Sequence, residues 1–443
     1  MADRTTRRTF LKQAAATAAV PFIITNWARA QGANDRLRIA FIATGGIGGA
    51  HIGEMEKLGQ DCPCYCDVDT DRMGGAAERW PKAKAYQDYR KMLDAEHKNI
   101  DGVMIGTPDH SHFPATAMAM GLGIHVYTQK PLTQTVWEAR QLAKLAKRHP
   151  KIVTQMGNQG HAGEDWRILY EWIHSGAIGQ VTEVHTWTNR PIWPQGIRRP
   201  LGKDPVPANL DWDCWIGPAK MRPFKSGVYH PFAWRGFWEF GAGALGDMAC
   251  HTMDGMFWSL DPGTTCATEP VEVNGKTRDC FPNSSIIKWE FPRRGDRPAF
   301  VQYWYDGGLK PKRPENLEQG RELPGTGNLF VGTKGTLIIP GDYGGGLETI
   351  PQGLKDEVGT PPKLLERSIG HYKEWVEAIK GNGKTVSNFA YAGPMTEVIL
   401  LGNVACRLGK RLEYDGEDMK IRNEPDANEF LTKQYRKGWD DWA

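Results

Sequence analysis

Two short segments, more than a hundred residues apart, carry the side chains that are best suited to chemistry. Residues 128–132 (TQKPL) place Lys130 directly after an apolar run, and residues 243–251 (GALGDMACH) place Asp247 and His251 four residues apart. On a helix these two residues face the same side. An imidazole oriented by a carboxylate can accept a hydroxyl proton while hydride leaves, and a lysine can stabilise the developing negative charge. The three residues therefore predict oxidation at a hydroxyl-bearing carbon, with a structural Asp/His hydrogen bond as the alternative.

A glycine-rich turn upstream predicts a nucleotide-binding site. Residues 37–43 (LRIAFIA) form a short apolar run that is typical of a strand buried on both faces. The following turn matches the dinucleotide-binding pattern, with Ala43 in the place of its first glycine. Its glycines let the backbone approach a pyrophosphate, which the amides at the start of the next helix then bind. The residues expected to contact the cofactor here are Thr44, Gly45, Gly46, Ile47 and Gly48.

A further cofactor contact is predicted at Asp67, which lies 22 residues after Gly45 at the end of the next expected strand. A carboxylate there can accept hydrogen bonds from the ribose hydroxyls and repel a 2′-phosphate, which favours NAD over NADP. Arg72 lies close enough in the sequence to leave NADP open. A helix cap or a turn acid is the alternative for Asp67.

Strands and helices continue to alternate as far as residue 156, which predicts an open, mostly parallel sheet. Residues 101–106, 123–128 and 151–156 are the expected strands. Ligands bind such a sheet at the carboxyl ends of its strands, so Lys130 is expected to point into the cofactor crevice. The further cofactor-binding residues predicted around these ends are Thr107, Pro108, His110, His112, Gln129, Lys130 and Asn158.

The second half of the chain contains a long segment, residues 190–243, that is rich in Pro, Trp, Gly and Arg. Seven of the 17 tryptophans lie between Trp187 and Trp258. Loops this long are usually functional, although most of these rings can equally pack the loop onto its domain. Indole rings suit the apolar faces of sugars, and Arg and His suit hydroxyls or a carboxylate. The predicted substrate-binding residues are His161, Arg167, Trp193, Tyr229, His230, Trp234 and Arg235.

These patterns predict an α/β protein with two domains. A Rossmann dinucleotide-binding domain is expected at residues 31–156. An α+β domain with a large, mostly antiparallel open sheet is expected at residues 157–443, for substrate binding and oligomerisation. Helices are expected over residues 363–380 and 394–408, and these last helices can pack back on the first domain. The tail at residues 433–443 is expected to dock on a neighbouring subunit.

Residues 1–30 predict export. Arg7 and Arg8 precede a short apolar stretch and an Ala-x-Ala site that ends at Ala30, which is the pattern of a twin-arginine signal peptide. The stretch is too short for a membrane span. Without the five basic residues and one acid of this segment, the totals of 55 and 52 become 50 and 51. A near-neutral chain gives no electrostatic case for nucleic-acid or membrane-surface partners, and we expect a periplasmic or extracellular protein.

The eight cysteines do not form a disulfide scaffold in a chain of this length. Cys62, Cys64 and Cys66 alternate, so on a strand they would share one face. No cluster of His or Cys with ligand spacing lies nearby. Buried strand cysteines are therefore favoured over a metal site, and no metal is predicted.

The segments ATGGIGGAH, CDVD, TPDHSH, TQKPL and GALGDMACH, in this order, resemble the Gfo/Idh/MocA oxidoreductase family. The resemblance spans nearly all of the chain after residue 30. It implies a Rossmann domain, then an α/β domain whose open sheet often forms the subunit interface, so a homodimer or homotetramer is expected. It implies catalytic roles for Lys130, Asp247 and His251, whereas Gln129 replaces the family's usual glutamate. The exported chain is similar to the secreted sugar-acting branch that includes glucose–fructose oxidoreductase.

The leading hypothesis is an NAD(P)-dependent oxidoreductase that acts on a sugar or polyol, with a cofactor held tightly because free NAD is scarce outside the cytoplasm. The alternative is a redox-neutral glycosidase that acts by transient oxidation and elimination, with His161, Tyr229 or His230 as the base. A binding protein without chemistry is disfavoured because the three candidate catalytic residues occur together.

Overall fold

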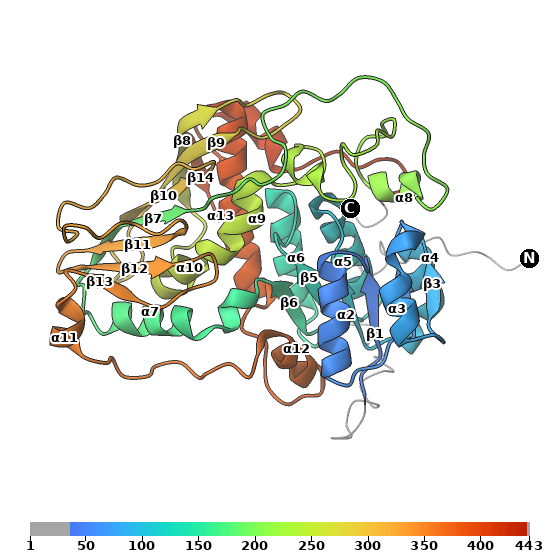
Figure 1. Ribbon diagram of the computed structural model, residues 1–443, viewed down its shortest axis with the longest axis horizontal. Coiled ribbons are helices and arrows are strands. Elements are labelled where there is room, and N and C mark those ends of the chain that lie inside the picture. Colours follow the sequence, from blue (N-terminus) through green and yellow to red (C-terminus); the bar gives the residue numbers. More distant parts are fainter. Residues whose placement is uncertain (1–35, 441–443) are drawn as a thin grey trace, which may run out of the picture.

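The computed structural model describes residues 36–440, so the export signal predicted at residues 1–30 lies outside the described residues. Figure 1 shows two sheets with helices between and around them. In chain order the strands and helices are β1 (Ile39–Ile42), α2 (Ile47–Lys57), β2 (Cys64–Cys66), α3 (Gly74–Arg79), β3 (Lys84–Tyr86), α4 (Tyr89–Glu96), β4 (Gly102–Ile105), α5 (His112–Gly121), β5 (His125–Gln129), α6 (Val136–Arg148), β6 (Thr154–Gly157), α7 (Glu164–His174), β7 (Val181–Trp187), α8 (Trp212–Ile216), α9 (Gly243–Thr252), α10 (Asp254–Leu260), β8 (Cys266–Asn274), β9 (Ser284–Phe291), β10 (Phe300–Tyr305), β11 (Gly327–Gly332), β12 (Thr336–Pro340), β13 (Glu348–Ile350), α11 (Leu354–Val358), α12 (His371–Ile379), α13 (Phe389–Leu408), β14 (Leu412–Asp415) and β15 (Lys420–Ile421).

The first sheet has six parallel strands in the order β3-β2-β1-β4-β5-β6. Strands β1 and β4 are buried along their whole length, as their continuous apolar runs predict. The strand order reverses between these two strands, so the connections at their carboxyl ends run to opposite faces and leave a crevice for a ligand. The predicted Rossmann sheet is confirmed.

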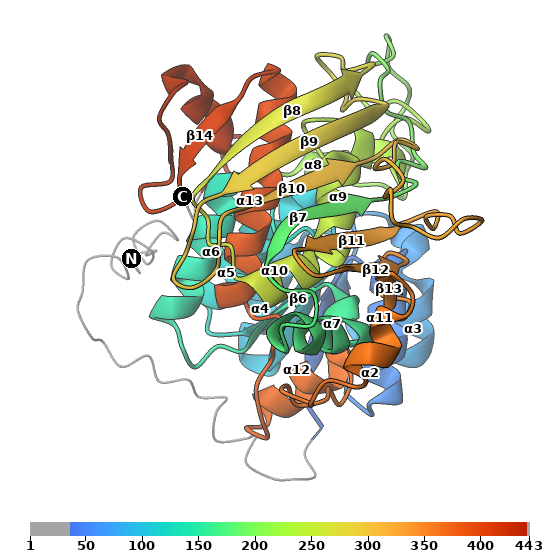
Figure 2. The same cartoon turned by 90° about the vertical axis from the view of Figure 1, so that its left-hand side faces the viewer.

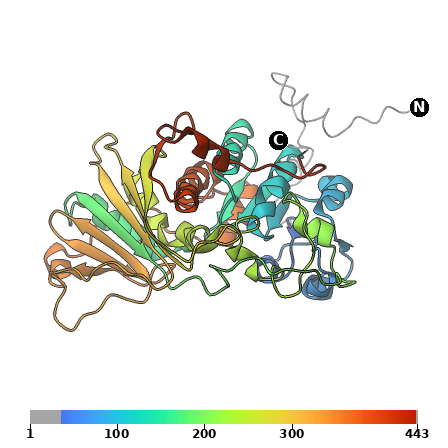
Figure 3. The same cartoon turned by 90° about the horizontal axis from the view of Figure 1, so that it is seen from above.

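The second sheet has nine strands in the order β13-β12-β11-β7-β10-β9-β8-β14-β15. Only β7 and β10 pair in parallel, and the other neighbours are antiparallel, so the prediction of a mostly antiparallel sheet is confirmed. Helices α9, α10 and α13 lie between the two sheets (Figure 3). Figure 2 looks onto the opposite face of this sheet.

Helix α13 forms the centre of the molecule, where it packs against α6, α9, β8 and β9. Its N-cap is Asn388, whose side chain accepts hydrogen bonds from the amides of Ala390 and Tyr391. The predicted start at residue 394 is therefore five residues late, because Pro394 lies within the helix and the asparagine cap gives the true start. In the part of the chain that the structure describes, α13 alone is long and apolar enough to cross a membrane. Most of it is buried within the protein, as in a core helix.

The C-terminal part of the chain returns to the first domain. Trp375 of α12 is fully buried, and its Nε1 donates to the Val126 carbonyl (3.1 Å). A Cβ at Gly102 would lie 2.8 Å from this indole ring, so only glycine fits beneath it. The helix predicted over residues 363–380 begins later than expected. Residues 363–370 have no helical structure, and α12 begins at His371.

The described part of the tail packs on its own chain. Lys433 Nζ lies 3.0 Å from Glu138 Oε1 on α6, and the Trp439 ring lies 3.7 Å from the guanidinium carbon of Arg90 on α4. These contacts lie within the chain, and docking of the tail on a neighbouring subunit stays a prediction.

The three alternating cysteines do not share one face. Cys64 and Cys66 belong to β2 and pack in the same apolar cluster. Cys62 precedes the strand and packs with Leu37 and Met55 in the cluster on the other side of the sheet. All three are buried free thiols, so a thiol core is confirmed but their common face is not.

Replacement of Trp375 tests whether α12 is an integral layer of the first domain. We expect Trp375→Ala to lower the free energy of unfolding by about 3–5 kcal/mol, because it opens a cavity in the core and removes the hydrogen bond to the Val126 carbonyl. The conservative Trp375→Phe keeps most of the ring and should cost much less. Urea unfolding followed by circular dichroism measures both, and equal small losses would contradict the assignment.

Candidate functional site

The glycine turn between β1 and α2 has a partly left-handed backbone, which sets where α2 begins. Ala43 has a φ of 73° and Gly46 a φ of 56°, so both occupy the left-handed region. A Cβ at Gly48 would lie 2.2 Å from the Ala43 carbonyl oxygen, which explains the need for glycine there. The start of α2 therefore lies directly against the end of β1, and its first amides can bind an anion.

Asp67 closes this turn from the end of β2. Its Oδ2 accepts hydrogen bonds from the amides of Thr44 (2.8 Å) and Gly45 (3.3 Å), and its Oδ1 accepts from the Asp69 amide (3.0 Å). Oδ1 accepts this one bond and has a further lone pair, so Asp67 can also accept from a ribose hydroxyl. Arg72 packs across Gly45 at the same place.

A cavity of about 350 Å³ adjoins the turn, and its walls come from both halves of the chain. From the first domain it is lined by Gly45, Gly46, Ile47, Asp67, Arg72, Thr107 and Pro108, all predicted to bind cofactor. The far wall comes from the Trp-rich segment. From that segment the lining includes Cys214, Trp215, His230, Phe232, Trp234 and Arg235. Three residues predicted for substrate binding are thus brought to the predicted nucleotide crevice.

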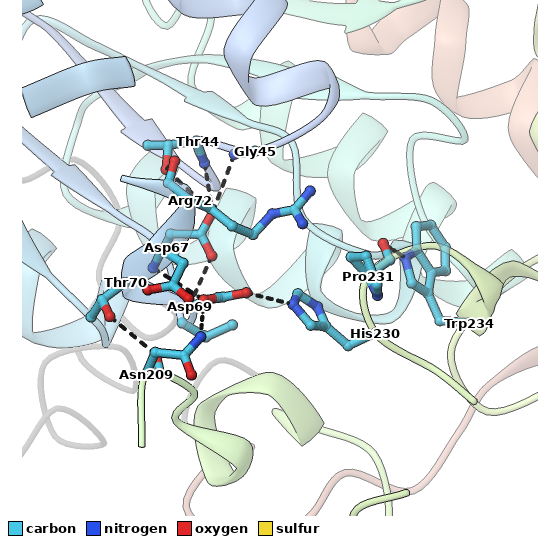
Figure 4. A network of polar contacts seen from close by, with 12 residues as sticks. Thr44, Gly45, Asp67, Asp69, Thr70, Arg72, Asn209, His230, Pro231 and Trp234 are labelled. Carbon is cyan, nitrogen blue, oxygen red and sulfur yellow. Dashed lines mark hydrogen bonds and ion pairs between the residues drawn. The ribbon is translucent and has the colours of Figure 1, made fainter. Parts of the chain in front are cut away.

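A polar contact joins the two walls (Figure 4). His230 Nε2 lies 2.8 Å from Asp69 Oδ2, and Asn209 Nδ2 donates to Asp69 Oδ1 (2.7 Å). Asp69 follows Asp67 on the same strand end, so His230 lies on the ribose side of the crevice. In this arrangement His230 contacts the first domain through Asp69, and its predicted contact with the substrate stays a prediction.

The candidate catalytic residues form an ion pair between the domains. Lys130 follows β5, and its Nζ donates to both the carboxylate and the carbonyl oxygen of Asp247 on α9, each at 2.9 Å. Arg235 Nε donates to the same carboxylate at 3.4 Å. Although burial disfavours ionisation, the charges of Lys130 and Arg235 lower the pKa of Asp247. Because Arg235 also lines the cavity, this cluster lies at the end of the crevice.

His251 is not oriented by Asp247. Both ring nitrogens of this buried histidine are without a hydrogen-bond partner, and its ring meets that of Tyr343 edge-on at 4.6 Å. The prediction that Asp247 orients the imidazole is wrong in this structure, because Lys130 and Arg235 take up the carboxylate. Burial and the nearby Lys130 charge lower the pKa of His251 well below its ordinary value, so its ring is neutral and can accept a proton.

Asp109, which the sequence interpretation overlooked, belongs to this cluster. It lies in the segment TPDHSH after β4 and is 4% exposed. Burial raises the pKa of Asp109 to about 7, against the opposing charges of Arg235 and Lys130. The sequence feature that could have identified Asp109 is its position as an acid at the carboxyl end of a central strand. The site thus contains one carboxylate that stays ionised and one that can hold a proton near neutral pH.

A buried histidine–carboxylate pair does occur, but at His161. Its Nδ1 lies 2.9 Å from Asp254 Oδ2, and Tyr391 OH donates to Asp254 Oδ1 at 2.6 Å. Asn158, predicted to bind cofactor, donates to the same carboxylate (3.2 Å) and is fully buried. Asp254 and Tyr391 were not predicted. Asp254 lies three residues after His251, whereas nothing in the local sequence marks Tyr391.

Three of the residues predicted to touch cofactor lie behind the crevice. His110 places its two ring nitrogens 3.2 Å and 3.1 Å from the carbonyls of residues 240 and 215, and His112 places its own near those of residues 131 and 107. Burial lowers the pKa of His110 to about 3 and that of His112 to about 4. Gln129 Oε1 lies 3.2 Å from His51. These side chains hold the walls of the crevice in place, which corrects their predicted direct contact.

Three of the residues predicted to bind substrate serve packing. Arg167 donates to the carbonyls of residues 161, 163 and 366, and Tyr229 is enclosed by aromatic rings including Trp215 and Phe240. Both side chains are 2% exposed and neither lines the cavity at the glycine turn, so the structure does not bring them to the crevice. Trp193 is buried beside Arg235 (5.9 Å), where it supports that guanidinium.

The crevice fits a dinucleotide by its chemistry. The turn supplies an anion site, Asp67 supplies a ribose acceptor, and the cavity falls within the size range of small-molecule sites. Within residues 36–440, no group of three or more His, Cys, Asp or Glu side chains is arranged to hold a metal ion.

Comparison with known proteins gives two matches along the chain. Residues 37–156 match the model of the Gfo/Idh/MocA oxidoreductase family, NAD-binding Rossmann fold, and residues 170–290 match the model of the C-terminal alpha/beta domain of the same family. Together they cover slightly more than half of the chain.

Curated relatives match over shorter stretches. An inositol 2-dehydrogenase from Rubrobacter xylanophilus is 25% identical over 159 residues, which is 35% of this chain and 45% of the relative. A glycosyl hydrolase family 109 protein from Shewanella pealeana is 28% identical over 157 residues, which is 33% of this chain and 34% of the relative. The chain therefore matches less than half the length of these relatives.

Solved structures share the fold over most of the chain. The WlbA dehydrogenase from Bordetella pertussis, solved in complex with NADH and UDP-GlcNAcA, has a TM-score of 0.60 and 16% identity. It covers 86% of this chain and 99% of its own.

Two substitutions in the turn should affect different properties, namely NAD binding and stability. We expect Gly48→Ala to weaken NAD binding at least about 10-fold, because its Cβ meets the backbone of residue 43. Ala43→Gly should leave binding intact and relieve a left-handed alanine, which costs about 1–2 kcal/mol. Titration with NAD and thermal unfolding measure the two effects. Unchanged binding by Gly48→Ala would contradict the assigned turn.

The buried Asp109 should make stability depend on pH. Its pKa rises from 3.8 to about 7 on folding, so between these values the folded state keeps a proton that the unfolded state has lost. The contribution of Asp109 to stability is therefore present below pH 4 and lost as the pH rises to about 7. We expect Asp109→Asn to gain stability over the wild type across this range, as measured by urea unfolding. A difference that does not vary with pH would contradict the shift.

Proposed function

The chain belongs to the Gfo/Idh/MocA oxidoreductase family, and we propose that it transfers hydride between a sugar or polyol carbon and a tightly held NAD(P). The observation that carries this proposal is the Lys130–Asp247 contact at the end of the crevice that the glycine turn begins. The inositol 2-dehydrogenase relatives and the sugar-nucleotide ligand of the WlbA structure support a carbohydrate substrate.

The residues divide the chemistry as follows. When bound, the nicotinamide supplies the hydride acceptor. Lys130, held by Asp247, places positive charge beside the hydroxyl oxygen and stabilises the alkoxide that develops there. Neutral His251 has unengaged ring nitrogens and accepts the hydroxyl proton. Trp234 and Arg235 provide an aromatic face and a cation where the substrate adjoins the crevice.

Retention of the cofactor follows from the two-walled crevice. A dinucleotide bound against the turn would be covered by the Trp-rich segment, which His230 ties to Asp69. A segment tied in this way must release its contacts before the nucleotide leaves, and this slows dissociation. Export through the twin-arginine route would add a reason for retention, and periplasmic or extracellular location is part of the proposal. NAD is preferred over NADP because Asp67 lies where a 2′-phosphate would be repelled.

A redox-neutral glycosidase is the second candidate. The His161–Asp254 pair provides a second proton acceptor besides His251, which an ordinary dehydrogenase does not need. The match to a glycosyl hydrolase family 109 protein supports this reaction class.

The test starts with protein purified without added nucleotide. Denaturation should release close to one equivalent of NAD or NADP per chain, identified by chromatography. Addition of inositols, hexoses and glycosides to the native protein should then produce the absorbance of reduced nicotinamide for one substrate class. A protein that holds no nucleotide and binds NAD weakly would contradict the trapped cofactor.

A matched variant separates binding from chemistry. Lys130→Met should retain the nucleotide yet reduce it at least about 100-fold more slowly, because the charge at the alkoxide is lost. Equal rates would contradict the role of Lys130. The proposed homodimer or homotetramer is checked on the same preparation by sedimentation.

A further inference from the structure

A second cavity lies outside the nucleotide crevice, and the charges along its walls are unbalanced. It measures about 470 Å³ and shares no lining residue with the crevice. Five cationic side chains line it against two carboxylates. The cations are Arg199, Lys220, Arg222, Arg278 and Arg407. Like charges gathered around one cavity repel one another, so a negative group placed among them would be stabilised.

The two carboxylates are shared among three arginines. Arg199 Nη2 lies 3.3 Å from Glu239 Oε2 and 3.2 Å from Asp279 Oδ1. Arg222 pairs with the same oxygen of Glu239. Arg278 Nε lies 3.7 Å from Asp279 Oδ2. Because a carboxylate binds one guanidinium best, through two parallel hydrogen bonds, part of the arginine charge stays uncompensated.

Arg222 is the buried member of the group, and it has donors without partners. Its side chain is only 7% exposed, and neither its Nε nor its Nη1 has a hydrogen-bond partner among the described residues. Nε of Arg199 lacks a partner in the same way. A guanidinium only donates hydrogen bonds, and a buried donor that stays unpaired costs free energy. An oxyanion in the cavity that both arginines line would bring the acceptors and the negative charge that they lack.

The other two cations extend the site toward a neighbouring cavity. Lys220 and Arg407 are exposed, and within the described part of the chain neither forms an ion pair. The guanidinium carbon of Arg407 lies 5.3 Å from the centre of the Trp238 ring. Both residues, together with Trp238 and Glu239, also line a cavity of about 290 Å³. The two cavities therefore share a wall, and a ligand larger than a single ion has room there.

We propose that this cavity is a second binding site, which takes a small molecule through a carboxylate, sulfate or phosphate group. Arginine suits such groups because its planar fork donates two parallel hydrogen bonds to two oxygens. Arg199 and Arg222 bind the oxyanion from the wall, and Lys220 and Arg407 add positive charge at its exposed side. The ligand binds while the nucleotide stays in place, because no residue lines both sites.

The experiment measures binding to the nucleotide-loaded protein, in which the anion site of the glycine turn is already filled. Inorganic phosphate, sulfate and glucuronate are titrated by calorimetry at constant ionic strength, with neutral glucose as the comparison. We expect saturable binding of at least one of these anions. An inorganic ion that binds as tightly as glucuronate identifies a free anion as the ligand, whereas tighter binding of glucuronate identifies an acidic saccharide.

Two exposed side chains test the site without disturbing the core. We expect Lys220→Ala and Arg407→Gln each to weaken anion binding at least about 3-fold, because each removes one charge beside the oxyanion. Any binding of glucose should stay unchanged in both variants. Glu239→Gln should strengthen anion binding, because it releases the arginines that share this carboxylate. The matched control Lys363→Ala removes an exposed lysine that lines neither cavity and should bind as the wild type does.

Circular dichroism and the amount of retained nucleotide show that each variant is folded. Failure of all three anions to bind would overturn the inference. Anion binding that occurs only in nucleotide-free protein belongs to the glycine turn and would overturn it as well. The same holds if Lys220→Ala and Arg407→Gln bind the anion as tightly as the wild type does.

Discussion

The site depends on one interaction, the contact of Lys130 with Asp247 across the two halves of the molecule. Both side chains are nearly buried, and a buried charge is stable only when it is paired and otherwise satisfied. The lysine side chain meets this demand by donating to the carboxylate and to the carbonyl of the same residue. The carboxyl end of β5 and the first turns of α9 must therefore keep their relative position, which gives the reactive charges a fixed place.

The elements around this contact can be understood as the scaffold that keeps it. Helix α13 packs against both α6 and α9, so the helix that carries Asp247 and the first domain share one core. Trp289 of the second sheet donates to a carbonyl of this helix (3.1 Å), and Gly402 lets the indole approach. The last part of the chain then returns to α6 through Lys433 and Glu138. The two domains are joined by core packing on more than one side, which suits a site that must exclude water.

The sequence predicted what local pattern determines and missed what only folding brings together. Buried parallel strands, the glycine turn and the position of Lys130 follow from apolar runs and strand ends. The partner of Asp247 could not be predicted in this way, because spacing on one helix favours His251 whereas a lysine 117 residues away takes the carboxylate. The same limit applies to Asp254 and Tyr391, which lie 137 residues apart. Aromatic composition likewise located the Trp-rich segment but did not separate Tyr229, which packs, from Trp234, which lines the cavity.

The two buried histidines His251 and His161 differ in whether a carboxylate contacts the ring. His251 lies close to the Lys130 charge, and this charge together with burial keeps it neutral. Such a ring suits a short-lived acceptance of a proton while an alkoxide forms, because it holds that proton weakly. His161 instead contacts Asp254 at 2.9 Å, which holds its ring in one orientation. The two rings therefore differ in what surrounds them, because one has a carboxylate partner and the other has ring nitrogens without a hydrogen-bond partner.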